Sequence, residues 1–219
     1  MSSFISAVDL YWRVPGQPPK ELLTDINLDI SDNDICLIRG PSGSSKSILL
    51  GMMANLEVPS SGMLTYKKQN IERLTPKERA ACRNEIVYIP EDPPSLWDRT
   101  VYENIEYILK YQNIPSDVIF DRIMHLLKLT GLIGKRDMKP SRLSFIEKKV
   151  FFMAAALATE KSAIFCDLNI AGLPDEKDII RAVKNYVLRG GTIVMTAKEK
   201  VEIQTAHTKY VDIKDGKIK

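Results

Sequence analysis

The sequence predicts an α/β fold in which a mostly parallel β-sheet is covered by helices on both faces. Short apolar runs of strand length alternate along the chain with stretches of helical periodicity. These runs cover residues 35–39, 85–89, 162–167 and 191–196. A segment rich in glycine and serine joins the first of them to a helix-prone stretch. The length of 219 residues favours a single domain over 1–219.

The composition is that of an ordinary soluble, folded protein. The chain is 44% hydrophobic and 27% charged, and 31 Lys and Arg stand against 28 Asp and Glu. An excess of three positive charges does not predict a nucleic-acid partner. The longest apolar run, 150–158, falls short of the roughly 20 residues that cross a bilayer, and the N-terminus lacks a signal-peptide pattern. We therefore expect neither a membrane span nor a secretion signal.

Cysteine and histidine predict neither disulfides nor a transition-metal site. Cys36, Cys82 and Cys166 are an odd number of thiols without C-x-x-C spacing, which fits a reducing cytoplasm. The two histidines, His125 and His207, are far apart and lack neighbouring cysteines or paired carboxylates.

In the first part of the chain, alternation and turn residues define the elements. Strand-like runs cover residues 4–14, 22–30, 35–39 and 85–89. The segment Pro15 to Pro19 predicts a turn between the first two, and Pro90 is expected to end the last. Residues 48–53 are helix-prone, and Leu49, Met52 and Met53 fit a helix stripe that faces the core.

Helical patterns dominate the middle of the chain. Two helices are predicted around 101–111 and 118–129, and the break at 113–116 separates them. Together they indicate a helical insertion. Ser144 caps a further helix that runs through Leu157. The strands 162–167 and 191–196 follow.

The segment from Gly40 to Ser47 carries the clearest chemical motif. It reads Gly40, Pro41, Ser42, Gly43, Ser44, Ser45, Lys46 and Ser47. This matches G-x-x-x-x-G-K-[ST] except at Ser45, where the pattern has glycine. A loop between a strand and a helix gathers backbone N–H groups and the positive end of the helix around one point, which suits a di- or triphosphate. Ser45 adds a Cβ that crowds the phosphates or strains the turn.

Three side chains are candidates for phosphate and metal binding. Lys46 would place its charge on the outer phosphates, and the Ser47 hydroxyl would ligate Mg²⁺. Asp167, at the end of a distant strand, is the expected second metal ligand. Two structural alternatives stay open: the loop only caps a helix, and Asp167 is a helix cap at a strand end.

The order of these motifs resembles the ATP-binding-cassette (ABC) ATPase domains over nearly the whole chain, and it is most similar to the lipoprotein-release and cell-division branch. Trp12 (or Tyr11) stands where the family has its adenine-stacking aromatic, with core packing as the alternative, and 40–47 matches the Walker A motif. Residues 98–105 resemble the T-V-x-E-N run that opens the family's helical subdomain. The resemblance implies a P-loop NTPase fold of ABC type, with an N-terminal antiparallel β subdomain and a helical subdomain at about 95–145.

Several positions depart from the family's catalytic pattern. Glu91 stands in place of the Gln that contacts Mg²⁺, so it is a further candidate metal ligand. Asp167 matches the Walker B aspartate, but Leu168 replaces the catalytic Glu and Ala197 replaces the switch His. The D-loop at 171–174 lacks its Asp. Leu168 cannot accept a proton and Ala197 cannot donate a hydrogen bond, so we expect little hydrolysis.

The segment that resembles the LSGGQ signature is also altered. After Leu143 it reads Ser144, Phe145, Ile146 and Glu147. In the family the signature glycines allow backbone N–H groups to approach the γ-phosphate of the nucleotide on the partner subunit. Bulky Phe145 and Ile146 obstruct that approach, so the resemblance implies two impaired sites in a homodimer.

The resemblance therefore implies a degenerate ABC subunit that binds ATP and Mg²⁺ and hydrolyses little or none. Its partners would be an integral-membrane permease, docked near Glu91 and residues 97–114, and a second ABC subunit, for which we favour a paralogue; we expect no nucleic acid. It would lie in the cytoplasm, peripheral on the inner face of the cell membrane.

Two alternatives stay open. One is a working ATPase with substitute residues, for instance Glu91 as the group that orients water. The other is a docking or regulatory module that binds no nucleotide. A P-loop kinase is disfavoured, since no lid rich in arginine is evident.

Overall fold

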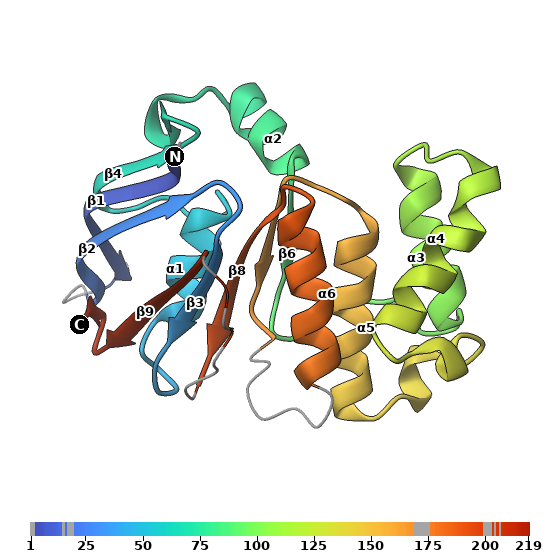
Figure 1. The fold of residues 1–219 in the computed structure, drawn as a ribbon. Helices are drawn as coiled ribbons and strands as arrows, with labels where there is room; N and C mark the ends of the chain where they lie inside the picture. The colour runs from blue at the N-terminus through green and yellow to red at the C-terminus, as the bar shows by residue number, and fades with distance from the viewer. Residues whose placement is uncertain are drawn as a thin grey trace.

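Two β-sheets and a set of helices form the computed structural model, which describes residues 3–14, 16, 20–168, 176–198, 203, 205 and 207–219. The smaller sheet is antiparallel and has the strand order β2-β1-β4-β5. Its strands are β1 (Ser3–Val14), β2 (Lys20–Ser31), β4 (Ser61–Tyr66) and β5 (Gln69–Asn70). This is the antiparallel β region that the resemblance implied at the N-terminus (Figure 1).

The larger sheet is mostly parallel and has the strand order β10-β9-β3-β8-β7-β6. Its strands are β3 (Ile35–Arg39), β6 (Ile86–Ile89), β7 (Ala163–Cys166), β8 (Thr192–Ala197), β9 (Thr208–Lys214) and β10 (Lys217–Ile218). Neighbours from β9 to β6 are parallel, and β10 alone among these strands pairs in the antiparallel sense. The predicted α/β class with a mostly parallel sheet is confirmed.

Helices lie on both sides of the larger sheet (Figure 1). They are α1 (Lys46–Met53), α2 (Pro76–Asn84), α3 (Val101–Tyr111), α4 (Ser116–Leu129), α5 (Phe145–Ala158) and α6 (Glu176–Leu188). Short 3₁₀ turns lie at Ile71–Arg73, Ile133–Lys135 and Pro140–Arg142. In Figure 1, α3 and α4 project away from the sheet beside α5, as expected of the predicted helical insertion. No helix in the part of the chain described here is both long and apolar enough to cross a membrane.

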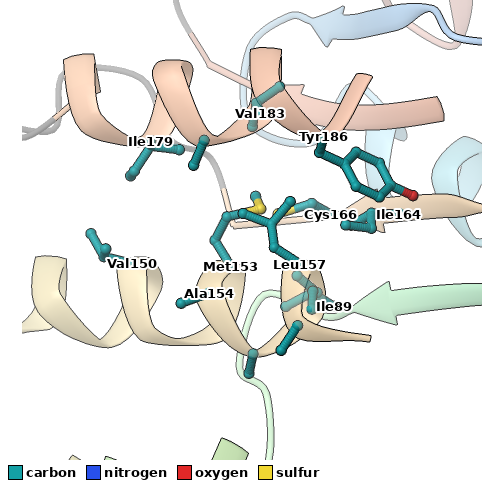
Figure 2. Packing of buried hydrophobic residues seen from close by; sticks show 14 of the residues in the cluster. Ile89, Val150, Met153, Ala154, Leu157, Ile164, Cys166, Ile179, Val183 and Tyr186 are labelled. Carbon is teal, nitrogen blue, oxygen red and sulfur yellow. The ribbon is translucent and has the colours of Figure 1, made fainter. Parts of the chain in front are cut away.

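Two hydrophobic cores form because the central strands are apolar on both faces. On β3, Ile35 and Leu37 belong to the core beneath α3 to α6, whereas Cys36 and Ile38 belong to the core shared with α1 and the antiparallel sheet. Strand β7 divides in the same way. Figure 2 shows the first core, where α5 and α6 face each other around β7. Continuous apolar runs are typical of strands that are buried on both faces.

Candidate nucleotide-binding site

The carboxyl ends of four parallel strands bring the candidate site residues to one edge of the larger sheet. Arg39 at the end of β3 pairs with Ala197 on β8, Met195 pairs with Cys166 on β7, and Cys166 pairs with Ile89 on β6. The loop after β3, Asp167 after β7 and Glu91 just after β6 therefore leave the sheet along the same edge. Ligand sites in α/β proteins lie at such an edge.

Gly40 fits tightly between strands at the start of the loop. Its N–H donates to the Ala197 carbonyl at 3.1 Å. A Cβ built on Gly40 would lie 2.1 Å from the Ile213 carbonyl oxygen of β9. Glycine is required here by this close approach of two backbones. Gly43, by contrast, leaves open space around the position of a Cβ.

Ser45 adopts the left-handed conformation that the motif's glycine would adopt more easily. It is the residue before α1, with φ 71° and ψ 20°, and its side chain makes no capping hydrogen bond. The left-handed region costs a non-glycine residue about 1–2 kcal/mol. Serine in place of glycine at position 45 therefore strains the turn, but the turn still adopts the left-handed conformation.

Replacing Ser45 with glycine is expected to stabilise the fold. The substitution relieves about 1–2 kcal/mol of backbone strain and adds about 0.5–1 kcal/mol of chain entropy in the unfolded state, so the free energy of unfolding should rise by roughly 0.5–1 kcal/mol. Urea denaturation measures the change. Ser42→Gly in the same loop is the control, because Ser42 is not among the residues of positive φ, and it should destabilise. A destabilised Ser45→Gly would contradict the strain.

Lys46 holds the loop together through its ammonium group. Its Nζ donates to the carbonyls of Gly40 at 2.8 Å and Pro41 at 2.7 Å, and it lies 3.2 Å from the buried Ser44 Oγ. Burial lowers the pKa of Lys46, and the nearby Asp167 carboxylate opposes that shift. Lys198 lowers the same pKa further, and Glu91 raises it. The charges of Asp167, Lys198 and Glu91 thus all act on Lys46 at this edge.

The two candidate magnesium ligands differ in their surroundings. Ser47 is exposed, while Asp167 is buried and accepts a hydrogen bond from the Thr196 hydroxyl at 2.6 Å. The described residues contain no group of three or more His, Cys, Asp or Glu side chains that could hold a metal. One hydroxyl and one carboxylate fit Mg²⁺ that takes its remaining ligands from phosphate and water. Sequence reasoning missed Thr196, because a contact between neighbouring strands carries no local signal.

The positions of the family's catalytic groups are apolar and buried. Leu168 is 1% exposed and Ala197 is fully buried, and both belong to the core beneath α5 and α6. Glu91 is exposed. The D-loop segment at 171–174 lies outside the described residues. Among the described residues, the carboxylates of Asp167 and Glu91 act on the pKa of Lys46.

The segment that resembles the signature begins α5 with a capping box. The Glu147 N–H donates to Ser144 Oγ at 3.2 Å, and the Ser144 N–H donates to Glu147 Oε2 at 2.8 Å. Phe145 is 72% exposed, and the ammonium of Lys149 lies 4.6 Å from the centre of its ring. Two backbone donors at this helix start are thus already used within the chain, and the exposed face presents an aromatic ring. Ile146 is half-buried against the first core.

Because of this capping box, the free energy of unfolding should depend on pH. The hydrogen bond from the Ser144 backbone lowers the pKa of Glu147. A lowered carboxyl pKa stabilises the fold above the unfolded value of about 4.3, and this contribution is lost as the pH falls through the folded value. Glu147→Gln should therefore lose about 0.3–1 kcal/mol at pH 7 and match the parent near pH 3. Urea denaturation across this range tests it, and Glu57→Gln, at an exposed glutamate outside any capping box, is the control. A difference that does not change with pH would contradict the prediction.

The structure also describes Trp12 and Asn104, two residues in segments that the family resemblance singled out. Trp12 is half-buried and packs against the core that contains α1, so its side chain is partly available to a ligand. Buried Asn104, in the run 98–105, accepts a hydrogen bond from the Leu96 N–H at 2.8 Å and donates to the carbonyls of Leu96 and Thr100 at 3.0 and 2.8 Å. The asparagine of that run therefore shapes the loop before α3.

Comparison with known proteins identifies a family. The model of the ABC transporter family matches residues 23–168. The methionine import ATP-binding protein MetN of Geobacillus kaustophilus is 31% identical over 197 residues, which are 89% of this chain and 58% of that protein. MetN of Legionella pneumophila (strain Paris) is 32% identical over 202 residues, 91% of this chain and 59% of that protein. The chain thus spans about three fifths of these relatives.

Solved structures show the same fold. The dimeric ATP-binding cassette MJ0796 in a post-hydrolysis state with ADP and Pi has a TM-score of 0.83 at 22% identity, covering 98% of this chain and 96% of that one. The cbiO1 subunit of Clostridium perfringens, part of the ABC transporter complex cbiONQ, has a TM-score of 0.79 at 22% identity, covering 100% of this chain and 87% of that one. With two thirds of its residues inside the family model, this chain belongs to the ABC transporter family.

Proposed function

We propose that the chain is an ABC-type ATP-binding subunit of a membrane transport or envelope complex that binds Mg·ATP and hydrolyses little or none of it. The observation that carries this proposal is that, at one edge of the larger sheet, the groups that bind phosphate are kept while the positions of the catalytic groups are apolar. The loop 40–47 keeps Lys46, its left-handed turn and a nearby Asp167, whereas positions 168 and 197 are buried and apolar.

The loop supports phosphate binding through its own residues. Lys46 would exchange its bonds to the Gly40 and Pro41 carbonyls for bonds to the outer phosphates. The open space at Gly43 leaves room beside the backbone N–H groups, and the half-buried Trp12 offers a surface for the adenine. Ser47 and Asp167 would hold Mg²⁺, with exposed Glu91 as a further ligand; the ion would neutralise charge on the phosphates.

A low rate of ATP hydrolysis follows from the side chains at the positions of the family's catalytic and signature residues. A general base typically contributes about 10²–10⁴ in rate, and Leu168 offers none. Ala197 has no donor for the γ-phosphate. Exposed Phe145, together with the capping box at Ser144 and Glu147, weakens what this chain could offer to a partner's nucleotide. We therefore favour a better-preserved paralogue as the second ABC subunit.

The permease would dock on the segment that precedes and includes α3. Leu96 and Trp97 are 41% and 46% exposed, and Tyr107 and Tyr111 are 61% and 82% exposed. Such a surface, close in sequence to Glu91, suits a protein partner.

The proposal places the chain in the cytoplasm, peripheral at the inner face of the cell membrane. It treats the chain as one domain over 1–219 with a helical subdomain at about 95–145. The transported substrate would be chosen by the permease, and the likeness to the lipoprotein-release and cell-division branch stays a prediction.

Equilibrium binding of Mg·ATP by calorimetry tests this function. We expect saturable binding that Lys46→Ala weakens by at least about tenfold, with turnover at the level of the blank. Lys77→Ala, an exposed lysine on α2, is the matched control. Circular dichroism checks that Lys46→Ala folds, and Lys46→Met preserves side-chain bulk if it does not. Turnover that Lys46→Ala abolishes would instead indicate a working ATPase, and Glu91→Gln should then impair it. No binding at millimolar ATP would indicate a docking module.

A further inference from the structure

A pocket of about 320 Å³ lies where α4, the end of α5 and α6 meet. Lys161 and Ser162 in its wall precede β7, and Gly191 precedes β8. The pocket therefore lies at the amino-terminal edge of these parallel strands, whereas the loop 40–47 lies beyond a carboxyl end. It is independent of the proposed nucleotide site.

Positive charge gathers in the walls of this pocket. The residues that line it include Arg122 from α4, Arg189 after α6 and Lys161 but only one acid, Glu160, so cations exceed anions by two. His125, one turn along α4 from Arg122, is exposed at the same pocket. Such a surplus in a concave site favours an anionic ligand.

Arg122 has buried donors that make no hydrogen bond within the described part of the chain. Its Nε and Nη2 are shielded from solvent and have no hydrogen-bond acceptor among the described residues. Glu160 Oε2 lies 2.9 Å from Nη2, but the pair is not aligned as a hydrogen bond. Arg189 Nη1 is 4.0 Å from the same carboxylate. Both guanidinium groups thus keep capacity for an acceptor that enters the pocket.

Glu160 reaches the two arginines from an unfavourable backbone conformation. Its φ is 49°, in the left-handed region just after α5, where glycine is the usual residue. The side chain that occupies this position partly neutralises Arg122 and Arg189. It would therefore compete with an incoming anion.

The other wall of the pocket is apolar and preformed. The Tyr186 hydroxyl donates to the Lys161 carbonyl at 2.6 Å. A Cβ on Gly191 would lie 2.2 Å from the ring carbon that bears this hydroxyl, so the ring packs directly on the backbone. Leu126, Leu129 and Leu157 complete the apolar side. Figure 2 shows Tyr186 reaching from α6 and Leu157 from α5.

We propose that this pocket binds a small amphipathic organic anion. Its carboxylate or phosphate would accept from Arg122 and Arg189, and its apolar body would pack on Leu126, Leu157 and the Tyr186 ring. The volume lies at the lower end of the range typical of small-molecule sites.

The two histidines of the chain allow a direct test by NMR. His125 lines the pocket, and His207 precedes β9, outside the pocket walls, so it serves as an internal reference. The protein, labelled with ¹³C in its histidine rings, is titrated with 4-phenylbutyrate, with 3-phenylpropyl phosphate and with neutral 4-phenylbutanol. We expect both anions, or the one whose head group the site prefers, to shift the His125 signal saturably while His207 stays in place.

Three variants test whether the charges of the pocket walls determine the affinity for the anion. Arg189→Gln should weaken anion binding by about tenfold, and Glu160→Gln should strengthen it, because a competing carboxylate is lost. Lys128→Gln, an exposed residue of α4 outside the pocket walls, removes one charge as the control and should leave binding unchanged. An equal shift with phenylbutanol, a parallel shift of His207, or no shift of His125 with either anion would overturn the proposal.

Discussion

Leu168→Glu, which places the family's glutamate at this position, is expected to lower the free energy of unfolding by about 3–5 kcal/mol at neutral pH. Leu168 is 1% exposed and belongs to the apolar core, so the new carboxylate would lose water without gaining a partner. Burial would also raise the pKa of this carboxyl, and a protonated group cannot act as a base. We therefore expect no gain in ATP turnover.

Urea denaturation as a function of pH measures the effect. The penalty arises from the ionised form, so it should shrink as the pH falls toward the ordinary glutamate pKa. Leu168→Met conserves volume and should cost less than about 1.5 kcal/mol. If Leu168→Glu were as stable as the parent and showed turnover that depends on Lys46, the site would lack only its base, and the reading of position 168 as a core position would be wrong.

Gly40→Ala is expected to lower the free energy of unfolding by about 3 kcal/mol and to abolish measurable Mg·ATP binding. The added methyl group would lie 2.1 Å from the Ile213 carbonyl oxygen and 3.0 Å from Ser44 Oγ. A backbone carbonyl in a paired strand cannot swing aside as a side chain can, so the loop itself would have to move. Its movement would displace the carbonyl to which Lys46 is bonded.

Gly43→Ala is the matched control in the same loop. Its φ is 79°, so alanine costs about 1–2 kcal/mol of backbone strain, but nothing lies within 4 Å of the added methyl group. Denaturation and calorimetry on both variants should therefore rank Gly40→Ala as the more damaging. Equal effects of the two variants would mean that only conformational freedom matters at Gly40.

Local signals predicted much of the fold. The helix over 101–111 agrees with α3, because Thr100 and Glu103 form a capping box at its start and the break near 113 ends it. The predicted helix near 118–129 begins two residues earlier, at Ser116. The sequence pattern indicated neither β4 nor β9. Ser61, Gly62 and Met63 are exposed on β4, so its partner β1 determines the strand more than its own apolar pattern does.

The candidate site was predictable where its chemistry is local. The spacing of Gly40, Gly43 and Lys46 indicates a phosphate loop within eight residues. The bond from Thr196 to Asp167 joins residues 29 apart, and the close approach of Ile213 to Gly40 comes from a distant strand. Such contacts depend on which strands become neighbours. The pocket beside Arg122 was missed for the same reason, since its walls come from three separate helices.

The position of β3 between β8 and β9 affects how the molecule folds. The ion pair of Arg39 with Asp212, which flanks the start of the loop, joins residues 173 apart in the chain. Contacts so distant in sequence are slow to form, because a long stretch of chain must close before they contribute. During synthesis, the strand that carries the phosphate loop gains both neighbours only after residues 192–214 have left the ribosome. Nucleotide could therefore stabilise this chain only late in folding, after the helical segment around α3 and α4 had been made.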